Sequence, residues 1–313
     1  MPELSVHLIT YNNEAHIEAT LQSILKQKIN FSYEIVVGDD CSTDNTYNIV
    51  KEYAKKEPQL FKINRNEKQL GILKNFKTTL DRCSGNYVFD IAGDDLFKEQ
   101  YSLQKLVDTL KNNTSLGFVD SGYDIMNNDT NKRISFTNKK FIVANKEDYK
   151  INILLGNIVP LGMCFNKELL YKYVDFKVYI NKGISIDDYP ILVDLIMNCD
   201  FERINESLHT YRVHNTSYSH EKDFEKLLFQ KKQMKSLFNL FTEKYNFSKS
   251  IQSNFNNAHH KTLVFLAGYF EDKSLGKEVF YKIKSKNLKD WIHYLSSQHR
   301  LFRKLISFRK KFI

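Results

Sequence analysis

The first part of the chain alternates short apolar runs with segments whose apolar residues recur at helical spacing. Runs bounded by turn residues predict strands at residues 4–10, 33–38, 60–64 and 86–92. Between them, spacing such as that of Ile17, Leu21 and Ile24 predicts helices at 14–27, 44–56, 72–82 and 99–112. Strands separated by helices of this length favour βαβ units and therefore a parallel sheet.

The second part of the chain has a more mixed pattern. Strand-like segments occur at 117–123, 161–165 and 207–213, and from Glu221 onward the helical pattern is nearly unbroken. We therefore expect an α/β domain at 1–220 and a helical region at 221–313.

Polar and acidic residues follow three of the predicted strands. Thr10 and Tyr11 follow the first, Asp39 and Asp40 the second, and Asp94 and Asp95 the fourth. Ligands bind beyond the carboxyl ends of parallel strands, and carboxylate oxygens suit Mg²⁺ or Mn²⁺ carrying a phosphate. Each acidic pair taken alone is also typical of a solvated turn or a helix cap, so the convergence of all three is the informative feature.

Four segments carry a resemblance to a known family: TYNNE at 10–14, EIVVGDDCSTDNT at 34–46, GILKN at 71–75 and DIAGDD at 90–95. In this order they resemble an inverting family-2 glycosyltransferase of the GT-A fold, over roughly residues 3–215. The resemblance implies a Rossmann-like α/β fold with a mostly parallel central sheet, flanking helices and a C-terminal helical region. Residues 1–115 would be the nucleotide-binding half and 116–220 the acceptor-binding half.

The resemblance also implies an activity: metal-dependent transfer of a sugar from a UDP-sugar to a hydroxyl of a glycan, lipid-linked or protein-linked acceptor. By the family pattern, the residues expected to bind the nucleotide are Thr10, Tyr11, Asn12, Glu14, Asp39, Asp40, Lys74, Asn75 and Asp94. Asp40 matches the acid that accepts a hydrogen bond from the uracil N3–H. Lys74 is explained equally well by a solvated helix face, and Asp44 is expected to cap the following helix.

A cation, Mn²⁺ or Mg²⁺, is implied by the last part of the DIAGDD segment. Asp95 matches the direct metal ligand, and Asp94 is expected at the ribose or the metal. Gly93 stands where the motif often carries Asp, which leaves the binding mode open. Downstream, the family element YRxHxxS matches Tyr211 to Ser217, so that Arg212 would contact the diphosphate and His214 would complete the metal shell. A structural role for His214 is the alternative.

Inversion needs a general base on the acceptor side, and a carboxylate suits removal of a proton from a sugar hydroxyl. The segment from Ile186 to Leu192 lies where the family carries its base motif at a helix start. We assign the base to Asp188, with Asp187 as the next candidate. The alternative is that both acids only cap the helix.

The net charge of +9 is unevenly distributed. From Glu221 onward there are 20 Lys and Arg against 8 Asp and Glu, while residues 1–220 carry 26 against 29. The run from Arg300 to Ile313 contains six basic residues and no acid, and its apolar residues share one helical face. This predicts an interfacial helix on anionic lipid, or else a helix that packs on the domain or on a second subunit. The slightly acidic body and the lack of a nucleic-acid-binding motif exclude nucleic acid as a partner.

Other sequence features indicate the cellular environment of the protein. Four cysteines without CxxC spacing argue against a disulfide framework or a zinc site. No apolar run approaches the roughly 20 residues that span a bilayer, and no apolar leader precedes the first strand. We expect a cytoplasmic protein, peripheral on the inner face of the cell membrane if the last helix binds lipid. A non-catalytic nucleotide-sugar-binding subunit is the alternative function, and the oligomeric state is open.

Overall fold

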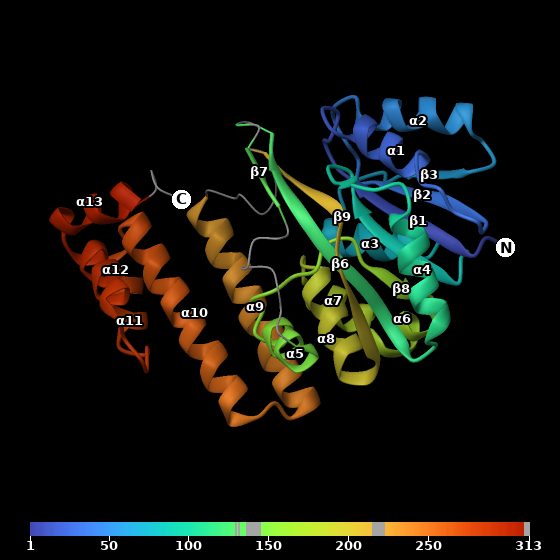
Figure 1. Cartoon of the computed structure of the whole chain (residues 1–313). Coiled ribbons are helices and arrows are strands. Elements are labelled where there is room, and N and C mark those ends of the chain that lie inside the picture. Colours follow the sequence, from blue (N-terminus) through green and yellow to red (C-terminus); the bar gives the residue numbers. More distant parts are fainter. Residues whose placement is uncertain (129, 131, 136–144, 215–222, 310–313) are drawn as a thin grey trace. The chain divides into compact units, whose positions relative to one another are not determined.

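The computed structural model describes residues 1–128, 130, 132–135, 145–214 and 223–309. The chain divides into two compact units, residues 1–217 and 218–313 (Figure 1).

The described part of the first unit contains one mixed sheet. Its strands are β1 (Leu4–Thr10), β2 (Tyr33–Asp39), β3 (Phe61–Arg65), β4 (Tyr87–Ala92), β5 (Leu96–Phe97), β6 (Leu116–Asn127), β7 (Lys132–Ile134), β8 (Cys164–Asn166) and β9 (Asp200–Val213). The order is β3-β2-β1-β4-β8-β6-β9-β5, with β7 paired to β6. Strands β1 to β4 are parallel, β8 is antiparallel to both of its neighbours, and β6 is parallel to β9. The α/β fold predicted from the sequence is confirmed.

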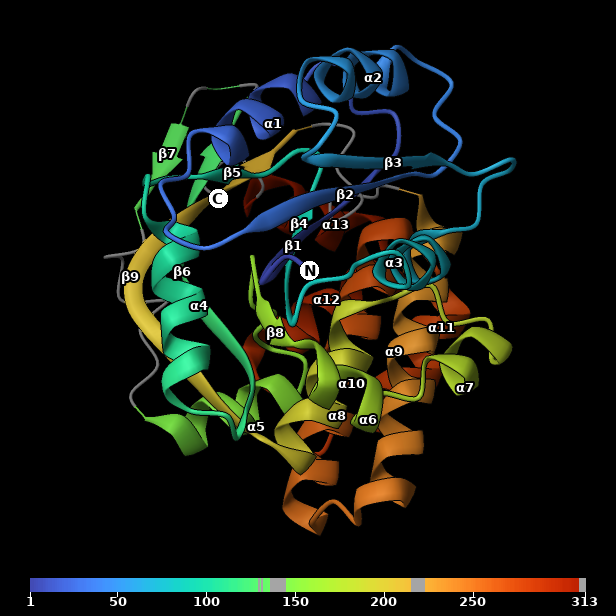
Figure 2. The same ribbon diagram turned by 90° about the vertical axis from the view of Figure 1, so that its right-hand side faces the viewer.

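Helices cover both faces of this sheet. In chain order they are α1 (Ile17–Leu25), α2 (Thr46–Lys56), α3 (Ile72–Leu80), α4 (Ser102–Asn112), α5 (Lys146–Leu154), α6 (Lys167–Tyr173), α7 (Phe176–Asn181) and α8 (Asp188–Asn198). Figure 2 shows α1 and α2 on one side of β2 and β3, with α3 on the other.

Alternation along the strands decides what each face contains. On β1, Leu4, Val6 and Leu8 join the main hydrophobic core, which also holds the buried residues of α1 and α4. Ser5 and His7, between them, point to the α3 side, where the His7 ring lies 4.5 Å from the Phe76 ring. The α3 face therefore carries buried polar groups, and the opposite face is apolar.

The largest differences from the predicted elements lie in the second half of the domain. β9 begins at Asp200, seven residues before the strand expected at 207–213, because its polar first half pairs along β6. β8 covers only Cys164–Asn166, since Gly162 has a φ of +62° that a regular strand does not adopt.

The described part of the second unit is helical. It consists of α9 (Phe224–Tyr245), α10 (Lys249–Phe270), α11 (Lys273–Phe280), α12 (Leu288–Gln298) and α13 (Arg300–Arg309). Phe238 of α9 stacks on Phe255 of α10 with ring centroids 3.7 Å apart, and Val264, Val279, Phe280 and Ile283 form a second small core. No described helix has the length and apolar character needed to cross a membrane.

Candidate active site

The carboxyl ends of β1, β2 and β4 lie side by side. Thr10 is in register with Asp39, and Ile9 with Ala92. The chain stays paired just beyond the strands, because the Asp40 amide donates to Thr10 O (2.9 Å) and the Gly93 amide donates to Ile9 O (3.0 Å). The residues predicted at three separate strand ends are thus brought to one edge.

The loop after β1 is tied to the loop after β2. Asn12 adopts a φ of +51°, a left-handed conformation that Asn tolerates better than most residues, and its Oδ1 accepts from the Thr43 amide at 2.8 Å. Glu14 accepts from the Asn45 amide at 2.9 Å. Asp44 accepts from the Thr46 amide at 3.0 Å at the start of α2. Within this fixed loop, the Tyr11 side chain is 40% exposed and presents its ring outward.

Asp39 and Asp40 are both buried and hydrogen-bonded. Asp39 accepts from the Ser42 amide and hydroxyl, so it closes its own loop. The Asp40 carboxylate accepts from Leu70 N (2.8 Å), Gly71 N (2.9 Å) and Asn66 Nδ2 (2.9 Å). An ionised carboxylate has about four lone-pair positions, so Asp40 retains the capacity for one further donor.

The α3 residues proposed for nucleotide binding differ in their surroundings. Asn75 is buried, donates to Gly38 O at 3.0 Å and accepts from Asn66 Nδ2 at 2.9 Å. Asn75 therefore helps to hold Asn66, which in turn donates a hydrogen bond to Asp40. Lys74 is exposed on the outer face of α3, which is the environment of the solvated-face alternative.

The turn after β4 explains why position 93 is glycine. A Cβ at Gly93 would lie 2.5 Å from Thr10 Oγ1 and 2.8 Å from Asn13 Nδ2, closer than side chains approach one another. The Thr10 hydroxyl is buried here and has no hydrogen-bond partner among the described residues. This close approach leaves no room for an aspartate at 93 and leaves a buried hydroxyl beside the Asp94 turn.

Asp94 and Asp95 face different surroundings. Asp94 Oδ2 lies 3.0 Å from His214 Nε2, and the His214 ring packs against His16 with centroids 4.2 Å apart. Asp95 is buried and accepts from the Arg212 amide at 3.1 Å. Burial, reinforced by the charge of Asp94, raises the pKa of Asp95 well above its ordinary value. A cation near this pair would stabilise the ionised form of Asp95 and so oppose the effects of burial and of the Asp94 charge on its pKa.

Arg212 connects three segments. Its guanidinium donates to Thr20 Oγ1 (2.8 Å), to His16 O (3.0 Å) and to Asp94 O. These acceptors belong to the chain itself, and the side chain is buried. Arg212 therefore fastens β9 to α1 and to the Asp94 turn; its predicted contact with a diphosphate stays a prediction.

Asp187 and Asp188 lie at the start of α8. Asp187 makes no side-chain capping hydrogen bond at this helix start, and the Asp188 carboxylate accepts from the next amide, that of Tyr189, at 2.5 Å. Burial and the charge of Asp188 raise the pKa of Asp187 well above its ordinary value, and burial also raises the pKa of Asp188. The roles predicted for Asp187 and Asp188, as general base or as helix caps, both stay predictions.

Asp90 and His7 are site residues that the sequence reasoning missed. His7 Nδ1 lies 2.7 Å from Asp90 Oδ1, and His7 Nε2 lies 3.0 Å from Phe76 O. A carbonyl oxygen only accepts, so the contact with Phe76 O requires the hydrogen on Nε2. The charge of Asp90 contributes to the raised pKa of Asp95, Asp187 and Asp188 alike. The charge of Asp90 on β4 therefore acts both on Asp95 and on the two acids at the start of α8. The signal available in the sequence was polar residues at inward positions of β1 and β4.

The side chains at the end of β4 are the candidate ligands for a divalent cation. Among the described residues, no three His, Cys, Asp or Glu side chains are grouped closely enough to hold a metal ion unaided. Mg²⁺ and related ions are commonly bound by one or two carboxylates together with substrate phosphates. Asp94 and Asp95, with His214 beside them, fit that arrangement.

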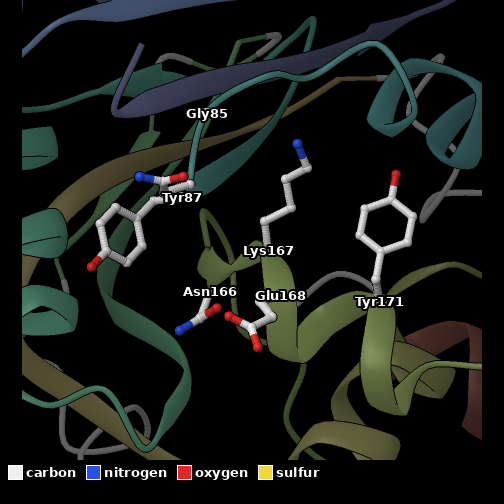
Figure 3. A pocket seen from close by; sticks show the side chains of 7 residues that line it. Gly85, Tyr87, Asn166, Lys167, Glu168 and Tyr171 are labelled. Atoms are coloured by element: carbon white, nitrogen blue, oxygen red, sulfur yellow. The ribbon is translucent and has the colours of Figure 1, made fainter. Parts of the chain in front are cut away.

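A surface cavity lies at the other end of β4 and is separate from this edge. It is lined by Gly85, Asn86, Tyr87, Asn166, Lys167, Glu168 and Tyr171. Figure 3 shows the Lys167 side chain extending between Tyr87 and Tyr171, and its ammonium donates to Cys83 O at 2.6 Å. Since β4 runs from this cavity toward Asp94, the two sites occupy opposite ends of the strand.

Comparison with known proteins identifies the family. The model of glycosyl transferase family 2 matches residues 5–173. An uncharacterized protein of Mycobacterium tuberculosis is 36% identical over 104 residues, which are 33% of this chain and only 30% of that relative. The Escherichia coli UDP-Glc:α-D-GlcNAc-diphosphoundecaprenol β-1,3-glucosyltransferase is 29% identical over 223 residues, 70% of this chain and 80% of that protein.

A solved structure shares the fold. The TarS fragment 1–349 of S. aureus, in complex with UDP-GlcNAc, superposes with a TM-score of 0.61 at 18% identity, covering 94% of this chain and 79% of that one. The family model covers more than half of the chain and includes the strand-end acids described above. The chain belongs to glycosyl transferase family 2.

Proposed function

We propose that this protein transfers a sugar from a UDP-sugar to a hydroxyl group of a glycan, lipid-linked or protein-linked acceptor, with inversion at the anomeric carbon. The observation that carries the proposal is the meeting of the residues that follow β1, β2 and β4 at one edge of the sheet. The charge of Asp90 acts on Asp95 at this edge and on both acids of α8. One site then has a donor side and an acceptor side. The UDP donor is supported by the names of the E. coli relative, a UDP-Glc-dependent glucosyltransferase, and of the TarS complex with UDP-GlcNAc.

The donor side is the edge formed by β1, β2 and β4. The exposed Tyr11 ring would pack on the base, and the remaining acceptor position of Asp40 would take the uracil N3–H. The unpartnered Thr10 hydroxyl offers a further hydrogen bond to the nucleotide. Asn75, Asn12 and Glu14 would act by fixing these loops, since each is already bonded within the chain.

Asp95, Asp94 and His214 would hold a Mn²⁺ or Mg²⁺ ion that offsets the charge growing on the departing diphosphate. Arg212 would keep this group in place by bonding the Asp94 carbonyl and presenting its amide to Asp95.

Asp188 would act as the general base on the acceptor side, with Asp187 beside it. The acceptor oxygen forms a bond to the anomeric carbon as the bond to the diphosphate oxygen breaks, and the hydroxyl proton passes to the Asp188 carboxylate. UDP leaves with the electron pair of the broken bond. A raised pKa brings the base nearer to neutral pH, where proton transfer is most effective.

A panel of sugar nucleotides tests the proposal directly. Release of UDP from one donor, dependent on added Mn²⁺ and increased by an acceptor glycan, is the expected result. Donor binding without UDP release would instead support the second candidate, a nucleotide-sugar-binding subunit without turnover. No binding of any UDP-sugar would contradict both.

The setting proposed for this reaction is the cytoplasmic side of a membrane. The E. coli relative is named for an acceptor attached to diphosphoundecaprenol, a lipid. An enzyme using such an acceptor would have to reach the membrane surface, and the basic helical region is the part of the chain suited to that contact.

A further inference from the structure

The loop between α11 and α12 presents apolar and basic side chains together. Tyr281 is 68% exposed, Leu288 75% and Trp291 48%. A group of large apolar side chains exposed together indicates a surface that interacts with a protein, a membrane or a ligand. Four exposed lysines lie in the same eleven residues: Lys282, Lys284, Lys286 and Lys289.

These apolar side chains form one surface. The Phe280 ring contacts both Tyr281 (centroids 5.7 Å apart) and Trp291 (4.7 Å). Leu288 precedes Trp291 by three residues in α12, so the two lie on one face of that helix. Tyr281 and Trp291 therefore adjoin the same ring, that of Phe280, and Leu288 lies on the Trp291 face of α12.

The backbone holds this surface in place. Ile283, in the middle of the loop, is buried in the small core with Phe280. Asn257 of α10 accepts from the Lys284 amide at 3.0 Å. Asn287 and Asp290 form a reciprocal capping box at the start of α12. The exposed side chains are thus presented by an ordered loop.

The local charge is positive. Asp290 is buried and paired with Lys261 at 3.2 Å, and Glu278 is paired with Lys282 at 2.8 Å. Lys284, Lys286 and Lys289 remain as the charges around the three apolar side chains.

We propose that the surface formed by Tyr281, Leu288 and Trp291 with Lys284, Lys286 and Lys289, called the 281–291 patch, binds the headgroup region of an anionic membrane. Aromatic and aliphatic side chains beside lysines are the composition of membrane-interface segments. Nucleic acid would also attract lysines and aromatic rings. An exposed leucine, however, neither stacks on a base nor pairs with a phosphate, whereas it gains from burial in lipid. The inference extends the proposed function, because a lipid-linked acceptor would lie at such a surface.

The chain contains one tryptophan, which makes the patch directly observable. Full-length protein is titrated with vesicles of equal parts phosphatidylglycerol and phosphatidylcholine at low salt, and with vesicles of phosphatidylcholine alone. The emission of Trp291 is expected to shift to shorter wavelength and to become protected from a soluble quencher with the anionic vesicles only. The effect should weaken as salt is raised.

Two variants with matched controls assign the binding to the patch. Replacing Lys284, Lys286 and Lys289 together by Gln should weaken vesicle affinity about 100-fold, at about fivefold per lysine. The same change at Lys51, Lys55 and Lys56, three exposed lysines of α2, should not. Leu288→Gln should weaken binding in a co-sedimentation assay, and Phe229→Gln, an exposed aromatic of α9, should leave it unchanged.

Several results would overturn the proposal. The first is a Trp291 emission that does not shift with anionic vesicles at low salt, and the second is an equal loss of vesicle affinity in the α2 and patch lysine variants. The third is an equal emission response to poly-uridylate. The fourth is an emission shift that depends on protein concentration in the absence of lipid. Vesicle binding is measured without donor, and UDP release is measured without vesicles. Failure of the patch and failure of the proposed transferase activity are therefore distinguishable.

Discussion

At the scale of single residues, Gly93 shows how one position affects the donor site. Its missing side chain lets the β4 turn approach Thr10 so closely that a Cβ would fall 2.5 Å from the hydroxyl. The turn can then direct Asp94 toward His214 and Asp95 toward the Arg212 amide. A side chain at position 93 would require Thr10 or Asn13 to move, so Asp94 and Asp95 are the candidate oxygen ligands after β4.

Asp95→Ala should abolish turnover and weaken Mn²⁺-dependent UDP binding, because loss of a ligand to a bound cation removes several kcal/mol of transition-state stabilisation. Isothermal titration with UDP, with and without Mn²⁺, measures the binding. Glu52→Ala, at an exposed ion pair of α2, is the control and should retain activity. Near-normal turnover in the Asp95 variant would refute the metal assignment.

Asp188→Asn should retain UDP-sugar binding and lose about 10² to 10⁴ in transfer rate, since an amide does not accept the acceptor proton. Single-turnover transfer and donor affinity are measured on the same preparation. A variant that loses donor affinity but retains its rate would show that Asp188 is structural. In that case Asp187 becomes the candidate base.

The pH dependence of transfer should reflect the coupled acids at α8. Activity needs the ionised base, and burial raises the pKa of Asp188 above the ordinary 3.8, so kcat/KM should fall on the acid side at a pH above that value. The negative charge of Asp90 contributes to this shift. Asp90→Asn should therefore move the acid limb to lower pH, with Asp108→Asn on α4 as a control that leaves it in place. If the acid limb of the pH profile does not move in the Asp90 variant, Asp90 does not affect the pKa of the general base.

At the scale of elements, the long pair of β6 and β9 contains a buried ionic group. Asp120 of β6 is fully buried and accepts from Arg203 of β9 and from Tyr149 of α5. Burial raises the pKa of Asp120 to about 6 although the Arg203 guanidinium opposes the shift. This group joins two strands and a helix that are distant in sequence, and β9 in turn carries Arg212 and His214 to the site.

Arg203→Met should lower the free energy of unfolding by about 3 to 5 kcal/mol, because it leaves a buried carboxylate without its partner. The folded-state pKa of Asp120 lies above its unfolded value of 3.8, so the folded state holds the proton more tightly and stability falls as pH rises through this interval. The loss in the variant should therefore be larger at pH 8 than at pH 5. Chemical denaturation at both pH values measures it.

Lys146→Met is the matched control for Arg203→Met. It breaks the exposed pair with Asp200 (3.1 Å), and such pairs contribute about 0 to 1 kcal/mol. Equal losses in the two variants would show that the Asp120 group is not stabilised as the geometry indicates.

At the scale of the whole molecule, the positive charge belongs to the second unit, which also exposes apolar side chains. α13 packs on its own unit, which was one of the alternatives predicted for the last helix, and its contact with lipid stays a prediction. Ile306 is buried and Arg303 is paired with Glu271, so one side packs on its own unit. Leu301 and Leu305 are 86% and 50% exposed. Phe308, Lys310, Lys311, Phe312 and Ile313 also belonged to the predicted helix, but the side chain of Phe308 and the last four residues lie outside the described part.

Replacing Leu301 and Leu305 together by Gln should weaken binding to anionic vesicles while UDP release from soluble donor stays unchanged, because the packed residue Ile306 is retained. Sedimentation with vesicles and analytical ultracentrifugation give the two readouts. Unchanged vesicle binding together with an altered subunit count would show that α13 is an assembly element.

The sequence alone determined the alternating strands and helices, the acids at three strand ends and the family. These features are local: periodicity sets strand and helix, and a parallel sheet brings the carboxyl ends of its strands to one edge. The exposure of Lys74 and the turn that Asp44 makes at the start of α2 also depend on neighbouring residues, and the roles predicted for the two side chains stay predictions.

Only the tertiary structure decided which distant residues meet. His7 with Asp90, Asp94 with His214 and Asp120 with Arg203 are pairs separated by 83, 120 and 83 positions. Nothing local indicates that a polar residue inside an apolar strand will find its partner on another strand, because burying it becomes favourable only once that partner is in place. The electrostatic influence of Asp90 on both Asp95 and the acids of α8 is therefore a property of the folded sheet.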